Sequence, residues 1–207
     1  IAIAHVRGGG ELGRQWYNQG KGRHKQNGFD DFIACAEYLI SHGYTTSETL
    51  VISGGSAGGL LVAASLNQRP ELFGGCVAEV PFVDVTNTML NPLLPLTVIE
   101  YEEWGNPNHP TEYNTISQYD PYRQYTGQYY PPMLVTAGLH DPRVGYWEPT
   151  KWIAKIRTLH PDSSNILLKI NMSSGHSGAS GRLDMLQEDA WHNAFIVNCI
   201  RTSRQSI

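Results

Sequence analysis

Ser56 is the residue whose surroundings most clearly indicate chemistry. It lies in the segment Gly54-Gly55-Ser56-Ala57-Gly58-Gly59, after an apolar run at residues 50–53 and before a run of helical character at residues 60–66. A strand, a tight glycine turn carrying a serine and then a helix are the context in which Gly-x-Ser-x-Gly is a nucleophile elbow. Such a turn strains the serine backbone, so we expect Gly54 and Gly58 to supply the room that it needs. The pattern favours a nucleophile over a serine that stands by chance in a glycine-rich loop.

An acid and a base follow Ser56 in the order that a catalytic triad requires. Asp141 comes after the apolar run 133–138, and His176 comes after the apolar run 166–170. In α/β-hydrolases the acid and the histidine follow the serine in this order, each on a loop after a strand. Taken singly, each of the two could be a turn or surface residue, and His140 is an alternative base, although it precedes the acid. The order predicts Ser56 as nucleophile, His176 as base and Asp141 as the group that orients it.

The elements that must position these residues alternate along the chain. Apolar runs predict strands at residues 1–6, 50–53, 75–80, 133–138 and 166–170. Helical spacing predicts helices near residues 29–40, 60–66, 146–159 and 183–200, while residues 81–130, rich in Pro, Asn and Tyr, suggest an excursion above the sheet. Alternation of this kind predicts an α/β-hydrolase fold, with a mostly parallel, doubly wound sheet and helices on both faces.

Composition narrows the class of protein. A length of 207 residues suits one domain, and a net charge of −4 gives no reason to expect a nucleic-acid partner. No apolar run approaches the length of a membrane span, and no metal-ligand spacing is present, so we expect no membrane, metal or other cofactor. Cys35, Cys76 and Cys199 stand among apolar neighbours, which predicts reduced core thiols in a cytoplasmic protein.

Four motifs together resemble the prolyl oligopeptidase family of serine peptidases. They are Arg7-Gly8-Gly9-Gly10-Glu11-Leu12-Gly13, Asn27-Gly28-Phe29-Asp30-Asp31-Phe32, Gly54–Gly59 and Gly175-His176-Ser177-Gly178. Within the family, alanine after the serine is similar to the oligopeptidase B type. The resemblance implies that 1–207 is part of the catalytic domain, with the first strands and an N-terminal β-propeller absent.

The resemblance also assigns substrate-binding residues. The stretch Glu100-Tyr101-Glu102-Glu103-Trp104-Gly105 is similar to the oligopeptidase B segment in which two glutamates bind the basic side chain before the cleaved bond, which implies this role for Glu100 and Glu102. Without the resemblance, these acids suggest a solvated turn, and we expect Glu103 to lie at the surface. Arg143 would bind a substrate carbonyl, and Val144 would line the specificity pocket.

The oxyanion hole needs two donors. The backbone N–H of Ala57 follows the nucleophile and is expected to be one of them. The resemblance implies that the other is a tyrosine hydroxyl from upstream of residue 1, whereas Arg7–Gly10 only shapes its loop.

These expectations describe a serine oligopeptidase that cleaves short, basic peptides after Arg or Lys through an acyl-enzyme. Three alternatives stay open. They are cleavage after proline, which a carboxylate at position 100 disfavours, carboxylesterase activity on the same fold, and an inactive hydrolase-like fragment.

Overall fold

Four parallel strands form the sheet of this computed structural model, which describes residues 1–205 and the side chains of residues 1–202. The strands are β1 (Val51–Gly55), β2 (Gly75–Glu79), β3 (Met133–Gly138) and β4 (Ile166–Asn171), and they neighbour one another in chain order. Val51 pairs with Gly75, Cys76 with Met133, and Met133 with Ile166. All four strands therefore end at the same edge of the sheet, where the segments that follow them come together.

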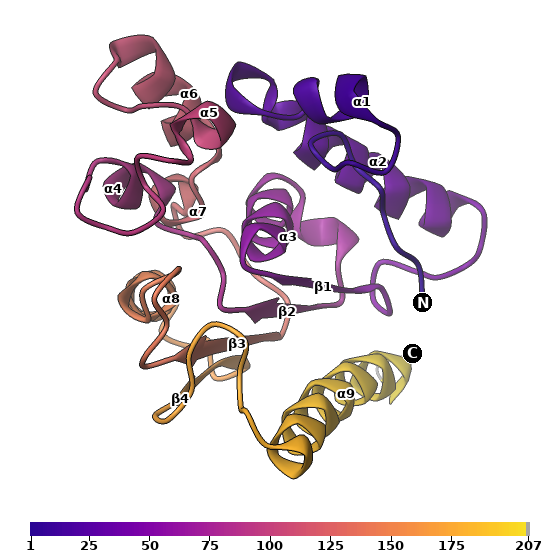
Figure 1. The fold of residues 1–207 in the computed structure, drawn as a ribbon. Helices are drawn as coiled ribbons and strands as arrows, with labels where there is room; N and C mark the ends of the chain where they lie inside the picture. Colours follow the sequence, from indigo (N-terminus) through magenta and orange to yellow (C-terminus); the bar gives the residue numbers. More distant parts are fainter. Residues whose placement is uncertain (206–207) are drawn as a thin grey trace.

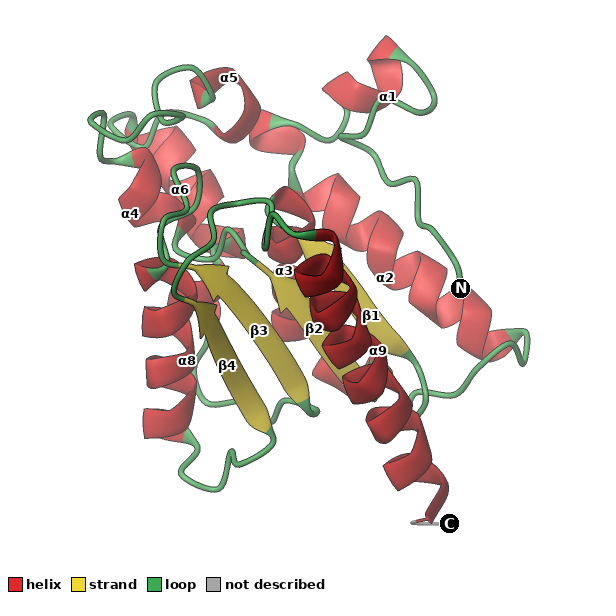
Figure 2. Ribbon diagram, turned by 60° about the horizontal axis from the view of Figure 1, so that its bottom comes forward, coloured by secondary structure: helices red, strands yellow, loops and turns green. Residues whose placement is uncertain are grey.

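Helices cover both faces of the sheet, as the sequence predicts. Figure 2 shows α9 crossing one face over β1 and β2, while α3 and α8 lie against the other face and α2 packs outside α3. α3 is apolar all round because it is enclosed between the sheet and α2. The helices are α1 (Arg14–Asn18), η1 (Gly22–His24), α2 (Gln26–Ser41), α3 (Ala57–Gln68), η2 (Pro70–Leu72), α4 (Val85–Met89), α5 (Tyr101–Trp104), α6 (Pro110–Tyr119), α7 (Pro121–Gln124), α8 (Trp147–Leu159) and α9 (Arg182–Gln205).

The segment between β2 and β3 leaves the sheet, as expected, and carries the four short helices α4 to α7. In Figure 1 these helices form a group beside α3, on the same side as η1 and α1. One apolar cluster packs between the sheet, α3 and α8, around Trp152 and Met133. A second cluster joins α2, α3 and the excursion around Phe29, Trp104 and Ile116. The second cluster fixes the excursion against the helix that follows Ser56.

Two expectations about the fold are wrong. Residues 1–6 form no strand, because no other strand lies beside them within the described residues, and Ile1 and Ile3 are exposed. Cys35 is also exposed, on the outer side of α2, whereas Cys76 and Cys199 are buried between β2 and α9. Within residues 1–205, none of the helices combines the length and the apolar character that crossing a bilayer requires.

Candidate active site

Ser56 lies in the turn between β1 and α3 with a left-handed backbone, at φ 55° and ψ −116°. Its N–H donates to the carbonyl oxygen of Glu79 at 2.8 Å, and its own carbonyl accepts from the N–H of Phe82 at 3.1 Å. Such a conformation costs roughly 1–3 kcal/mol outside glycine and persists where the surroundings fix it. These two bonds tie the strained turn to the end of β2.

The glycines of this turn differ in what they accommodate. A Cβ at Gly54 would lie 2.3 Å from the carbonyl oxygen of Gly58, so only glycine fits there. A Cβ at Gly58 would meet nothing within 4 Å, so the expectation that this glycine supplies room is wrong. The close approach falls one residue later, where a Cβ on Gly59 would lie 2.5 Å from the Cβ of Pro81. The reason is that α3 turns this position, and not Gly58, toward the loop after β2.

Asp141 and His176 meet across the loops that follow β3 and β4. His176 Nδ1 lies 2.7 Å from Asp141 Oδ2, and the two side chains are 13% and 1% exposed. The other oxygen, Asp141 Oδ1, accepts the backbone N–H groups of Arg143 at 2.8 Å and Val144 at 3.0 Å. His140 bonds instead through its backbone to Ser174. The carboxylate is thus fixed on both sides, and His176 is the histidine that it orients.

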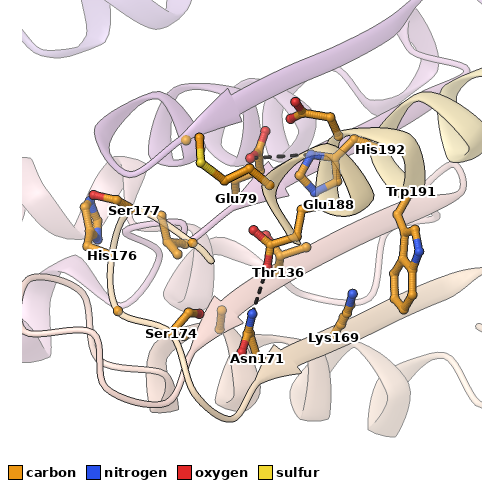
Figure 3. A pocket seen from close by; sticks show the side chains of 18 of the residues that line it. Glu79, Thr136, Lys169, Asn171, Ser174, His176, Ser177, Glu188, Trp191 and His192 are labelled. Carbon is orange, nitrogen blue, oxygen red and sulfur yellow. Dashed lines mark hydrogen bonds and ion pairs between the residues drawn. The ribbon is translucent and has the colours of Figure 1, made fainter. Parts of the chain in front are cut away.

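A cavity of about 390 Å³ lies at the carboxyl ends of the strands, beside α9, and contains Ser56 and His176 in its lining. We call it the His176 cavity. Figure 3 shows this cavity, in which Glu79 pairs with His192 and the side-chain amide of Asn171 donates a hydrogen bond to Glu188. Within the described residues the side chain of His176 bonds only to Asp141, which leaves Nε2 without a partner.

A second, smaller cavity of about 70 Å³, which we call the Glu100 cavity, also has Ser56 in its lining. Glu100, Arg143 and Val144 line it together with Ser56 and Ala57, so the fold brings together most of the expected substrate-binding residues. As the first residue of α3, Ala57 has a backbone N–H with no acceptor inside the helix. Ser56 therefore lines both cavities, one of which contains His176 and the other Glu100.

The two glutamates that follow Glu100 point elsewhere. Glu102 is 75% exposed and pairs with Lys21, whose bond lowers the pKa of the Glu102 carboxyl. Glu103, expected at the surface, is only 23% exposed, because Lys25 Nζ at 2.7 Å and the hydroxyl of Tyr17 at 2.9 Å both bond to it. Periodicity did not show this burial, since the partners are Tyr17 of α1 and Lys25, which joins η1 to α2, and both are far away in the sequence.

The glycine loop at residues 8–10 lines neither cavity. The guanidinium of Arg7 donates two hydrogen bonds to the carboxylate of Asp31 in α2, from Nε at 2.8 Å and from Nη2 at 2.6 Å. Gly8, the next residue, has φ 99°. A Cβ on Gly20 would lie 2.1 Å from the carbonyl carbon of Arg7. These glycines therefore allow two loops to pack closely on α2.

Several residues around the site have no clear signal in the sequence. Phe82, Met89, Leu96, Thr97 and Trp104 also line the Glu100 cavity. Four of them are apolar, which indicates only burial, and the hydroxyl of Thr97 donates to the carbonyl oxygen of Thr88 at 3.0 Å. The described residues place no three His, Cys, Asp or Glu side chains together in a way that could hold a metal ion.

Glu148 of α8 also lies near the site and also has no clear signal in the sequence. Its side chain is buried and accepts the backbone N–H groups of Val83 at 3.1 Å and Asp84 at 3.0 Å and the hydroxyl of Thr88 at 2.7 Å. Burial, which outweighs these bonds, raises the pKa of the Glu148 carboxyl to about 7. Thr88 lines the Glu100 cavity and Glu148 does not, so Glu148 holds a lining residue of that cavity in place through this hydrogen bond.

Comparisons with known sequences agree on one family. A model of the prolyl oligopeptidase family matches residues 1–203. Protease 2 of Moraxella lacunata is 48% identical over 198 residues, which cover 96% of this chain and 29% of the relative. Dipeptidyl aminopeptidase BI of Pseudoxanthomonas mexicana is 45% identical, over 95% of this chain and 27% of the relative. The chain thus spans less than a third of the length of these relatives.

Solved structures give the same result. Oligopeptidase B from Leishmania major superposes with a TM-score of 0.92 at 48% identity, covering 96% of this chain and 28% of that one. Oligopeptidase B from Trypanosoma brucei, solved with covalently bound antipain, has a TM-score of 0.92 at 52% identity, covering 95% of this chain and 28% of that one. The sheet and its helices match the catalytic domain of these peptidases.

Proposed function

The chain belongs to the prolyl oligopeptidase family of serine peptidases, and from this premise we propose that it cleaves short peptides after Arg or Lys through an acyl-enzyme on Ser56. The observation that carries the proposal is that Ser56 lines both the His176 cavity and the Glu100 cavity. One cavity supplies a base to the nucleophile, and the other supplies a carboxylate to a substrate side chain.

In the first half of the proposed reaction, His176 Nε2 takes the proton of the Ser56 hydroxyl as Oγ attacks the scissile carbonyl carbon. Asp141, fixed by its 2.7 Å bond to Nδ1, holds the ring in the tautomer that leaves Nε2 free and stabilises the imidazolium. The N–H of Ala57 donates to the oxyanion. His176 then passes its proton to the leaving amine, and an ester on Ser56 remains.

In the second half, a water molecule gives a proton to His176 Nε2 and attacks the ester carbonyl. The collapse of that intermediate returns the proton to Ser56 Oγ and releases the peptide acid. The Trypanosoma brucei relative was solved with covalently bound antipain, which supports a covalent step in this family of peptidases.

Glu100 carries the proposed preference for basic side chains. Its carboxylate lines the cavity beside Ser56, where a guanidinium or ammonium would form a charge-assisted hydrogen bond. We propose that Arg143 holds a backbone carbonyl of the substrate and that Val144 packs against the stem of the basic side chain. Glu102 contributes less to the proposal than the sequence suggests, because its side chain pairs with Lys21 outside the cavity.

A fluorophosphonate probe tests the nucleophile. We expect one covalent adduct on Ser56, seen by mass spectrometry of the digested protein, and none in Ser56→Ala. Folded protein that forms no adduct would show that the chain is an inactive hydrolase-like fragment.

A panel of N-acylated amide substrates that differ only in the residue before the scissile bond tests the specificity. We expect Arg and Lys to exceed norleucine and proline in kcat/KM, and Glu100→Gln to lower the Arg rate at least tenfold with little change for norleucine. Preference for proline, or equal losses on both substrates, would contradict the assignment of Glu100. If none of these N-acylated substrates is cleaved and the same peptides with a free N-terminus are cleaved, the result would indicate dipeptidyl release, the activity named for the Pseudoxanthomonas relative.

A further inference from the structure

The indole of Trp104 bonds directly to the carboxylate of Glu100. Its Nε1–H donates to Glu100 Oε2 at 2.7 Å, and both side chains line the Glu100 cavity. The two residues lie four positions apart, at the N-cap and the last residue of α5, which places them on one face of this turn. Within residues 1–205 no other hydrogen bond reaches this carboxylate, so Oε1 is left for a ligand.

Three neighbours fix the indole in place. Lys25 Nζ lies 4.1 Å from the centroid of the Trp104 ring, and the ring of Phe82 meets it edge-on at 5.2 Å. The hydroxyl of Tyr119 donates to the backbone carbonyl of Trp104 at 3.5 Å, and Trp104 itself is only 5% exposed. A ring enclosed in this way has one direction in which its N–H can point, and that direction is toward Glu100.

The ammonium group of Lys25, which lies over the Trp104 ring, forms its ion pair with Glu103. Lys25 Nζ donates to Glu103 Oε1 at 2.7 Å, and both side chains are largely buried. Burial lowers the pKa of the Lys25 ammonium, and the charges of Glu103 and Glu100 oppose that shift. With Lys25 balancing Glu103, the negative charge of Glu100 is left for a ligand of one positive charge.

We infer that Trp104 is a positioning residue for specificity, whose indole N–H aims the Glu100 carboxylate so that Oε1 meets the basic side chain of the substrate. The inference rests on the proposed function, because it takes Glu100 as the group that binds that side chain. A neutral donor suits this role, because it fixes the carboxylate without cancelling the charge that the substrate must find.

Trp104→Phe removes the donor and keeps an aromatic ring in the cavity wall. We expect the ratio of kcat/KM for an Arg substrate to that for its norleucine analogue to fall roughly tenfold, mainly through KM of the Arg substrate. In the Glu100→Gln background the same substitution should change this ratio little, because its effect passes through the carboxylate. Equal losses on both substrates, or the same loss in both backgrounds, would show that Trp104 only supports the fold.

Two further results keep the inference distinct from the proposed function. If the wild-type protein does not prefer Arg to norleucine, the proposed specificity fails; if it does and Trp104→Phe keeps the full ratio, only the role of Trp104 fails. Trp147→Phe, on an exposed ring outside the cavity, is the matched control and should behave as wild type.

A spectroscopic measurement covers the case in which Trp104→Phe does not fold. In a ¹H–¹⁵N spectrum, Glu100→Gln should shift one indole N–H resonance, that of Trp104, upfield, because an amide oxygen is a weaker acceptor than a carboxylate. If every indole resonance keeps its position, the bond does not exist in solution and the inference is overturned.

Discussion

Asp141 connects the proposed base to the Glu100 cavity at the scale of single residues. One carboxylate oxygen holds His176 Nδ1, and the other holds the backbone of Arg143 and Val144, which line the Glu100 cavity. The Asp141 side chain is only 1% exposed. Its hydrogen bonds therefore lie in an environment of low dielectric, where hydrogen bonds are strongest. Its proposed role therefore has two parts, since it orients the base and sets the loop that contacts the substrate.

Asp141→Asn tests the first part of that role. An amide has one acceptor oxygen, so it cannot serve both His176 and the two backbone N–H groups, and the imidazole would take the wrong tautomer. We expect kcat for an Arg amide substrate to fall about 10³- to 10⁴-fold. Asp162→Asn, at an exposed position, should match wild type. Wild-type kcat in Asp141→Asn would contradict the assignment of this acid.

At the scale of elements, Gly54 and Gly58 in the turn between β1 and α3 allow the same substitution to be compared at a crowded and at an open position. Gly54→Ala places a Cβ 2.3 Å from the carbonyl oxygen of Gly58, whereas Gly58→Ala places one in open space. We expect Gly54→Ala to lower the free energy of unfolding by on the order of 3 kcal/mol and to abolish probe labelling of Ser56. Gly58→Ala should fold within about 1 kcal/mol of wild type in urea titrations. Equal effects of the two substitutions would show that the turn does not require Gly54.

The hydrogen bonds that join Glu148 of α8 to the segment around α4 are predicted to make stability depend on pH. The folded-state pKa of Glu148 is about 7, above the value of 4.5 for a free glutamate, so the folded protein binds this proton more tightly than the unfolded chain. The contribution of Glu148 to stability is therefore complete below pH 4.5 and is lost as the pH rises to about 7. Asp84, which pairs with Lys151, faces Glu148 and adds to the upward shift of its pKa.

Glu148→Gln tests this link, because the amide cannot ionise and keeps similar bonds. From pH 5 to pH 8, wild type should lose on the order of 3 kcal/mol of unfolding free energy that the variant keeps. Chemical denaturation at several pH values measures this difference. Glu188→Gln, which neutralises a carboxylate in the lining of the His176 cavity, is the control and should keep the wild-type slope. Parallel pH curves for wild type and Glu148→Gln would contradict the raised pKa.

At the scale of the whole molecule, α9 closes the face of the sheet opposite α3. It crosses β1 and β2 (Figure 2). Cys199 of α9 and Cys76 of β2 are both buried, and their thiols lie close enough to interact electrostatically. A Cβ on Gly75 would lie 2.9 Å from Cys199 Sγ, which shows how closely helix and strand approach. The thiols therefore report whether the helix stays in place.

Thiol labelling measures this packing directly. We expect the exposed thiol of Cys35 to react fast in native protein, and the buried thiols of Cys76 and Cys199 to react only on opening, because the native fold keeps the reagent away from them. Burial raises the pKa of all three thiols, that of Cys76 to about 12, so access separates Cys35 from the other two. Cys35→Ser should remove the fast phase and leave the slow one. Rapid reaction of Cys199 in native protein would mean that α9 detaches readily.

Local patterns predicted most of the elements. The elbow, the helix that begins at Ala57, the strand at residues 133–138 and the excursion above the sheet follow from side-chain periodicity and turn chemistry within short windows. The order Ser56, Asp141, His176 likewise predicted that three side chains lie at the carboxyl ends of parallel strands. These features are determined by sequence because their physical causes lie within a few residues of them.

Burial and side-chain direction were decided by the tertiary structure. Residues 1–6 look like a strand but have no strand beside them among the described residues, and Cys35 looks like core but faces outward. Of three neighbouring acids in one turn, only Glu100 lines the cavity, because Lys21 and Lys25 draw the other two away. Such outcomes depend on partners tens of residues away, which no local pattern records, whereas the conformation of the turn around Ser56 depends on glycines within the turn itself.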